Sequence, residues 1–261
     1  MPFADVNGQH IYFEDSGGDG VPVIFSHGFL MDHEMFRPQV AALSGEFRCI
    51  TWDERGFGQT EATGPFTYWD SADDALALLA HLDADRAFFV GMSQGGFLSM
   101  RAALRAPDRV LGLGLIDTQS GLEAEEVRPA YEAMTEEWTT NGPSDELADA
   151  IAGIIMSPGY DHTEWVAKWK ARPKDVIREP FRTLMDRDDI SDRLPEITAP
   201  AVVFHGEADT AIPMDKAEQL LKNLGHCEEL VRIPDAGHAS NLSHPAEVNG
   251  PLADFLRRHQ P

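Results

Sequence analysis

Short apolar runs, separated by longer amphipathic stretches, fill the first half of the chain. The apolar runs span residues 21–25, 47–52, 87–90 and 110–116. Such short apolar runs bounded by glycine, proline or charged residues are typical of buried strands. Residues 69–82 instead place apolar side chains at the spacing of an amphipathic helix. Strands that alternate with helices need crossover connections, so the pattern predicts a mostly parallel twisted sheet with helices on both faces.

A hairpin precedes this alternation, because residues 3–6 and 9–14 flank Asn7-Gly8, a pair typical of a tight two-residue turn. The alternation stops after about residue 120 and resumes with apolar runs at 201–204 and 229–233. Helical patterns fill the interval, at residues 125–139, 145–155 and 163–170. We therefore expect a core domain of residues 1–120 and 196–261, with a helical cap of residues 121–195 inserted in it.

The charge of the chain limits the kinds of partner that it can bind. The 44 acidic and 21 basic side chains give a net charge of -23, which repels phosphate backbones and anionic lipid headgroups. We expect no nucleic-acid or membrane partner, and the charge does not predict an oligomeric state. The N-terminus lacks a basic segment followed by an apolar one. Cys49 and Cys227 have no metal-ligand or C-x-x-C spacing, so we expect a cytoplasmic protein that uses no metal or organic cofactor.

The segment Gly91-Met92-Ser93-Gln94-Gly95 is the strongest chemical signal in the chain. It follows the apolar run 87–90 and precedes a helix-like segment, which is the context of a nucleophile elbow. The flanking glycines let a serine occupy a strained turn without Cβ clashes. At the helix N-terminus, unpaired NH groups favour the anion formed when the serine attacks an acyl carbon.

A serine nucleophile needs a histidine base and an acid that orients it. Asp209 follows the predicted strand 201–204, and His238 follows the predicted strand 229–233. We interpret these residues as the acid and the base, because the order serine, acid, histidine is typical of such sites on parallel sheets. For the acid, the main alternative is Asp117, which also ends a predicted strand, and weaker alternatives are Asp235 and Glu207. For the base, the alternatives are His226, His244 and His205.

Two main-chain NH groups are expected to form the oxyanion hole. The residue after the nucleophile, Gln94, supplies one of them. The other is assigned to Phe29, because the apolar run 21–25 leads into His27-Gly28-Phe29 and the glycine allows the chain to turn toward the serine.

Together these segments resemble the α/β-hydrolase family over nearly the whole chain. The resemblance covers His27-Gly28-Phe29, the segment from Asp53 to Thr60, the Ser93 elbow, the Asp209 loop and Gly237-His238. It implies the α/β-hydrolase fold, and the motifs look most like those of 3-oxoadipate enol-lactonases and small esterases. Gln94 departs from the Met or Leu of many relatives, and Thr60 from the usual serine. We expect the Gln94 side chain to lie near the acyl group and to alter the polarity of the pocket.

Aromatic and methionine residues of the cap are expected to cover the pocket above Ser93. The pocket candidates are Met92, Trp138, Met134, Met156 and Trp165, and for any single cap residue among them packing of the cap onto the core is the favoured alternative. The expected function is a serine hydrolase that cleaves a small to medium, largely apolar carboxylic ester or lactone through an acyl-enzyme. A C–C bond hydrolase, a cofactor-free perhydrolase or haloperoxidase, and a slow-turnover ligand sensor on the same fold are the alternatives.

Overall fold

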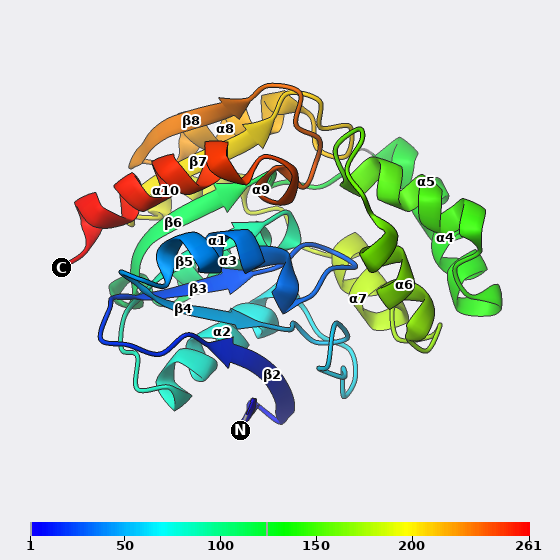
Figure 1. The fold of residues 1–261 in the computed structure, drawn as a ribbon, viewed down its shortest axis with the longest axis horizontal. Helices are drawn as coiled ribbons and strands as arrows, with labels where there is room; N and C mark the ends of the chain where they lie inside the picture. Colours follow the sequence, from blue (N-terminus) through cyan, green and yellow to red (C-terminus); the bar gives the residue numbers. More distant parts are fainter. Residues whose placement is uncertain (1, 124) are drawn as a thin grey trace.

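The computed structural model describes residues 2–123 and 125–261, which form one eight-stranded sheet in the order β1-β2-β4-β3-β5-β6-β7-β8 (Figure 1). The strands are β1 (Phe3–Val6), β2 (Gln9–Asp15), β3 (Pro22–Ser26), β4 (Arg48–Trp52), β5 (Ala87–Met92), β6 (Val110–Ile116), β7 (Ala201–Gly206) and β8 (Cys227–Ile233). The pairs β1–β2 and β2–β4 are antiparallel and the other pairs are parallel. The predicted mostly parallel sheet is thereby confirmed.

Helices cover both faces of this sheet. One face carries α2 (Tyr68–His81), α3 (Gln94–Arg105) and α8 (Met214–Asn223); the other carries α1 (Arg37–Leu43), α9 (Ser240–Ser243) and α10 (Pro245–His259). Short 3-10 helices η1 (His33–Phe36) and η2 (Pro107–Arg109) lie in the connections. Thr67 caps the N-terminus of α2 in a capping box: its side chain accepts a hydrogen bond from the Asp70 NH, and the Asp70 side chain accepts one from the Thr67 NH.

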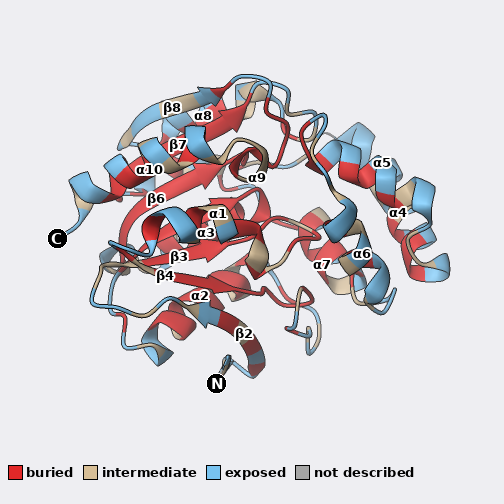
Figure 2. Cartoon of the chain, viewed as in Figure 1, coloured by how far each residue is buried: buried red, intermediate tan, exposed pale blue. Residues whose placement is uncertain are grey.

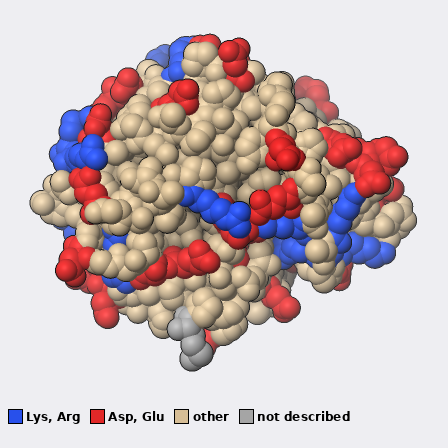
Figure 3. All heavy atoms as spheres, in the orientation of Figure 1, with Lys and Arg blue, Asp and Glu red and all other residues tan. Residues whose placement is uncertain are grey.

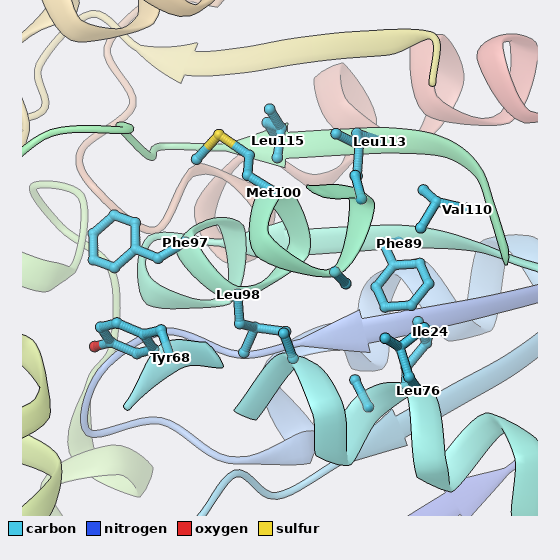
Figure 4. Close-up of a cluster of buried hydrophobic side chains, with 14 of the residues drawn as sticks. Ile24, Tyr68, Leu76, Phe89, Phe97, Leu98, Met100, Val110, Leu113 and Leu115 are labelled. Carbon is cyan, nitrogen blue, oxygen red and sulfur yellow. The ribbon is translucent and has the colours of Figure 1, made fainter. Parts of the chain in front are cut away.

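The central strands are apolar along their whole length because they are buried on both faces. In β3, Ile24 packs with the α2–α3 side, whereas Val23 and Phe25 pack with the α1–α10 side. In β5, Phe89 likewise packs on the α2–α3 side, whereas Phe88 and Val90 pack on the α1–α10 side. This follows from the two-residue period of a strand. Figure 4 shows Ile24 and Phe89 meeting side chains of α2 and α3, and Figure 2 shows the central strands buried between exposed helix surfaces.

Four helices, which we call the cap helices, connect β6 to β7. They are α4 (Arg128–Asn141), α5 (Asp145–Ile155), α6 (Thr163–Ala171) and α7 (Arg178–Met185), with η3 (Glu125–Val127) before them and η4 (Ser191–Glu196) after them. Figure 1 shows the cap helices on the side toward which the arrows of the parallel strands point. The division of the chain at residues 121 and 195 into core and cap stays a prediction.

Two elements differ from the sequence pattern for identifiable reasons. The helix α7 was not predicted. Its Pro180 lies in the first turn, where a missing NH breaks no helical hydrogen bond. The predicted strand 229–233 began too late, because β8 begins at Cys227 and its outer position in the sheet leaves most of its residues partly or fully exposed. Polar residues at such an edge interrupt the apolar run by which a strand is recognised.

Polar contacts fasten the cap helices to the core. Lys168 of α6 forms ion pairs with Asp32 and Glu34, and its nitrogen lies 2.8 Å from Asp32 Oδ2. The Trp169 indole donates to the Leu30 carbonyl at 2.7 Å. Figure 3 shows basic groups near α6 beside acidic groups over α4 and α5. Within the described part of the chain, no helix has the length and apolarity needed to span a bilayer.

Candidate active site

Ser93 joins β5 to α3 in a conformation that non-glycine residues rarely adopt. Its φ is 52° and its ψ is -117°, so the turn stores backbone strain. The Ser93 NH donates to the Ile116 carbonyl at 2.9 Å. A Cβ at Gly91 would collide with the main chain of Gly95, and one at Gly95 would collide with that of Ser26. The two glycines therefore allow the sharp turn and the close approach of α3 to β3.

Three polar side chains from separate loops meet at this turn. His238 Nε2 lies 3.0 Å from Ser93 Oγ, and His238 Nδ1 lies 2.8 Å from Asp209 Oδ2. The loop after β7 carries Asp209, and the loop after β8 carries His238. Because β5, β7 and β8 are parallel, their carboxyl ends bring these loops to one edge of the sheet.

Main-chain groups hold the acid in place. Asp209 Oδ1 accepts hydrogen bonds from the NH groups of Ala211 at 2.8 Å and Ile212 at 3.0 Å, which leaves Oδ2 for His238. Burial disfavours charge on Asp209, but the charge and hydrogen bond of His238 outweigh it and lower the pKa of Asp209. Burial likewise opposes charge on His238, yet Asp209 raises the pKa of this imidazole. The pair therefore favours an imidazolium beside a carboxylate.

The two residues predicted to supply the oxyanion hole lie close to Ser93 along the chain or in space. The residue Phe29 follows Gly28, and a Cβ at Gly28 would contact the side chains of Met92 and Ser93, so this turn passes directly over the elbow. Gln94 begins α3. Within the described residues, neither the Phe29 NH nor the Gln94 NH donates to another protein group. An oxyanion hole requires two main-chain NH groups without protein partners near the reacting serine, and the assignment of Phe29 and Gln94 to it stays a prediction.

The Gln94 side chain lies elsewhere than expected. It is 1% exposed and points into the core, where Nε2 donates to Glu54 Oε1 at 3.2 Å and Oε1 accepts from the Tyr68 hydroxyl at 3.1 Å. It is absent from the lining of the cavity over Ser93. The expectation that it alters pocket polarity was wrong, because a buried acid and a tyrosine hydroxyl satisfy its amide below the elbow.

The alternative acids and bases occupy other positions. Asp117 is fully buried and accepts hydrogen bonds from the NH groups of Gly206 at 2.8 Å and Ser240 at 3.0 Å. It fastens two loops, and the structure gives it no hydrogen bond to His238. Asp235, Glu207 and His226 are exposed, and His244 bonds to the Ser243 hydroxyl.

His205 lies between the two acids in a buried cluster that the sequence did not predict. Its Nε2 lies 2.9 Å from the Ile212 carbonyl and 3.5 Å from Asp209 Oδ2, and its Nδ1 lies 3.9 Å from Asp117 Oδ1. Ligand atoms of Asp117, His205 and Asp209 are close enough together for a metal ion. However, both acids already accept main-chain NH groups and Asp209 binds His238, so the arrangement is accounted for by loop packing.

An apolar cavity of about 100 Å³ opens above Ser93 and His238. Of the pocket candidates, Met92 and Met134 line it. The cavity is also lined by residues that the sequence did not single out, among them Phe97, Glu123, Tyr131, Ile151, Ile154 and Leu184. Amphipathic cap helices present apolar residues on more than one side, so only the packed structure shows which side faces the serine.

Trp138, Met156 and Trp165 do not line this cavity and were wrongly chosen as pocket residues. All three are buried within the apolar cluster that joins the cap to the core. The Trp138 ring packs on that of Trp169 with centroids 6.2 Å apart, and the Lys168 ammonium lies over the Trp165 ring. Their large apolar surfaces stabilise the position of the cap.

Known proteins share this architecture across the whole chain. The 3-oxoadipate enol-lactonase 1 of Acinetobacter baylyi is 24% identical over 269 residues, covering 97% of this chain and 95% of its own length. The enol-lactonase from Burkholderia xenovorans LB400 has a TM-score of 0.89 at 28% identity, covering 98% of this chain and 100% of that structure. A thermophilic esterase from Thermogutta terrifontis has a TM-score of 0.88 at 27% identity, with coverage of 100% and 98%.

A family model described as the alpha/beta hydrolase fold matches residues 21–245. That match includes the elbow, the acid loop and the histidine loop. The chain therefore belongs to the alpha/beta hydrolase family, in its group of esterases and enol-lactonase-like proteins.

Proposed function

We propose that the protein is a serine hydrolase that cleaves a neutral, largely apolar carboxylic ester or lactone through an acyl-enzyme. One observation carries the proposal: an unbroken hydrogen-bonded line from Asp209 through His238 to Ser93 at the floor of an apolar cavity. The names of its relatives, an esterase and enol-lactonases, support the same class of reaction.

In the proposed mechanism, His238 Nε2 takes the proton of Ser93 as Oγ attacks the carbonyl carbon. The Oγ lone pair forms the new C–O bond, the π electrons of the C=O bond move to the carbonyl oxygen, and the NH groups of Phe29 and Gln94 bind the resulting oxyanion. Asp209 holds the imidazole in position and stabilises its cation. Collapse of the intermediate expels the alkoxide, which takes the proton from His238. Water then enters, loses a proton to His238 and attacks the acyl-enzyme, and the acid departs as Ser93 regains its proton.

The charge of the cavity favours neutral substrates over anionic ones. Glu123 lines the cavity, and no lysine or arginine belongs to the described lining. The Glu123 carboxylate forms an ion pair with Arg187 and accepts a hydrogen bond from Gln119 Nε2 at 3.3 Å. Arg187 is itself buried over the Phe97 ring, 4.5 Å from its centroid. A second carboxylate placed beside Glu123 would be desolvated without a free cation to neutralise it.

Ser93→Ala is expected to lower ester turnover by about three orders of magnitude or more, because no other group on the proposed reaction path can form the acyl-enzyme. Hydrolysis of p-nitrophenyl acetate by purified wild type and variant measures the loss. The variant should keep the thermal unfolding temperature of the wild type. Near-normal turnover in a preparation free of host esterase would refute the mechanism.

In the pH profile of kcat/KM, the midpoint of the acid limb is expected above the ordinary histidine pKa of about 6.5. The reason is that Asp209 raises the pKa of His238 and only the neutral imidazole is a base. Activity should therefore rise as the pH passes upward through this raised value. Asp209→Asn removes the charge responsible, so its remaining activity should show the limb at lower pH. A limb that stays in place in the variant would contradict the pairing.

Anionic substrates are expected to react at least tenfold more slowly than neutral ones of the same size, because Glu123 lines the cavity over Ser93 and the described lining of that cavity contains no lysine or arginine. Methyl butyrate and monomethyl succinate form a suitable pair, compared by kcat/KM in a pH-stat. Glu123→Gln leaves Arg187 unpaired, so it should narrow the difference. Equal rates for the two esters in the wild type would show that Glu123 does not select substrate charge.

A further inference from the structure

A second hollow borders the cavity over Ser93. We call it the outer groove; it encloses about 620 Å³ between α4, α5 and the loop after β7. Six residues line both the cavity and the groove, namely Glu123, Tyr131, Met134, Ile151, Ile154 and Ala211. The two spaces therefore lie against each other, and the same six side chains contact both of them.

The outer groove gathers most of the exposed large apolar side chains of the described chain. These are Leu122, Val127 and Ile154, with 45%, 39% and 48% of their surface exposed, and the remaining one is Leu221 on α8. The first three line the groove, whereas Leu221 does not. Apolar side chains concentrated in one exposed hollow mark a surface that binds an apolar ligand.

The volumes distinguish what each space can hold. Pockets for medium-sized ligands usually enclose about 300–1,000 Å³. The cavity over Ser93, about 100 Å³, is below that range and suits the reacting ester group with a few carbons. The outer groove, about 620 Å³, lies within it. A substrate that uses both spaces needs a chain extending away from its ester group.

We propose that the outer groove binds the apolar chain of the substrate, so that the natural substrates are esters with a medium to long hydrocarbon chain. This rests on the proposed function and specifies its substrate class. Because the groove shares six lining residues with the cavity over Ser93, we assign the substrate itself as its occupant. A second copy of the chain or a lipid surface would cover the rim but would have no reason to share the walls of the reaction cavity.

The test is a chain-length series measured below the critical micelle concentration. We compare p-nitrophenyl acetate, butyrate, octanoate and decanoate, and then the acetates of butanol, octanol and decanol. In the wild type, kcat/KM should rise at least tenfold from the shortest to the longest chain in one of the two series. The series in which it rises identifies whether the acyl or the alcohol chain occupies the groove. A flat profile in both series overturns the proposal.

Substitutions inside and outside the groove distinguish chain binding in the groove from a general effect of exposed apolar side chains. The double substitution Leu122→Ser with Val127→Ser should reduce the ratio of long-chain to short-chain kcat/KM at least fivefold. Leu221→Ser, which removes a similarly exposed leucine outside the groove, should leave that ratio unchanged. A change in oligomeric state or vesicle binding without a change in the ratio would assign the groove to another partner and overturn the proposal. Absence of Ser93-dependent hydrolysis of any ester would instead refute the proposed function.

A second inference concerns Glu54, which lies beneath the oxyanion hole. Its side chain is completely buried; Oε1 accepts from Gln94 Nε2 at 3.2 Å, and Oε2 has no partner among the described residues. The Glu54 NH donates to His27 Nε2 at 3.0 Å, and His27 Nδ1 donates to the Gly28 carbonyl at 2.8 Å. That carbonyl belongs to the same peptide group as the Phe29 NH.

Glu54 thus connects to both donors of the oxyanion hole. Its side chain fixes the residue that carries the Gln94 NH. Its main chain, through His27, fixes and polarises the peptide that carries the Phe29 NH. We infer that Glu54 is a positioning residue that acts as a neutral carboxylic acid.

The surroundings of Glu54 favour the neutral form. Burial raises the pKa of Glu54 well above its usual range, the Gln94 hydrogen bond lowers it, and the charge of Asp74 raises it further. Asp74 is paired with Arg55, whose Nη2 lies 2.8 Å from it. The Tyr68 hydroxyl bonds to Gln94, and His27 contacts the main chain. A carboxylate at Glu54 would place uncompensated charge near the developing oxyanion.

Glu54→Gln and Glu54→Met test this role. The glutamine keeps a neutral acceptor for Gln94, so kcat should stay within about threefold of the wild type. The methionine has similar size but no acceptor, so kcat should fall at least tenfold with KM within twofold. Gln94→Met should cause a similar loss, and the double variant should lose little more, because both substitutions break one contact. An equal loss in both Glu54 variants, no loss in either, or effects confined to KM would overturn the inference.

Discussion

The strained turn at Ser93 is the constraint on which the rest of the site depends. A positive φ at a non-glycine residue costs on the order of 1–3 kcal/mol, so neighbouring contacts must hold it. The Ser93 NH bonds to β6 through Ile116, and the Thr118 hydroxyl donates to the Ser93 carbonyl at 2.7 Å. The central position of β5 places the turn between β3, which carries the Gly28–Phe29 loop, and β6. The same sheet order thus fixes the positions of the proposed nucleophile and of the residues proposed to carry both oxyanion donors.

Buried acids around the histidine are differentiated by their partners. Burial and the negative charge of Asp209 raise the pKa of Asp117 to about 6, whereas His238 lowers the pKa of Asp209. Of the two carboxyl groups, Asp117 therefore takes up a proton at the higher pH, and Asp209 keeps the negative charge beside His238. Two neighbouring carboxyl groups with pKa values displaced in opposite directions assume different roles, as carboxyl pairs in other enzymes do.

The sequence predicted the core elements and the meeting of Ser93, Asp209 and His238 because short loops connect each of them to a recognisable strand. It was wrong about Trp138, Met156 and Trp165, because a large apolar side chain has the same periodicity whether it packs a helix or lines a cavity. Gln94 shows the same limit. Its position in the chain predicts where its NH lies, but the direction of its side chain depends on Glu54 and Tyr68, which are distant in sequence.

The charge that argues against an anionic substrate also acts on the product. In the proposed reaction, deacylation converts a neutral acyl-enzyme into a carboxylate beside Glu123, in a cavity whose described lining contains no lysine or arginine. The net charge of the chain, -23, adds a long-range repulsion. The free acid is therefore bound less favourably than the ester from which it came. The apolar walls contact the hydrocarbon chain of the substrate equally before and after the reaction, so the new negative charge of the product is what favours its release.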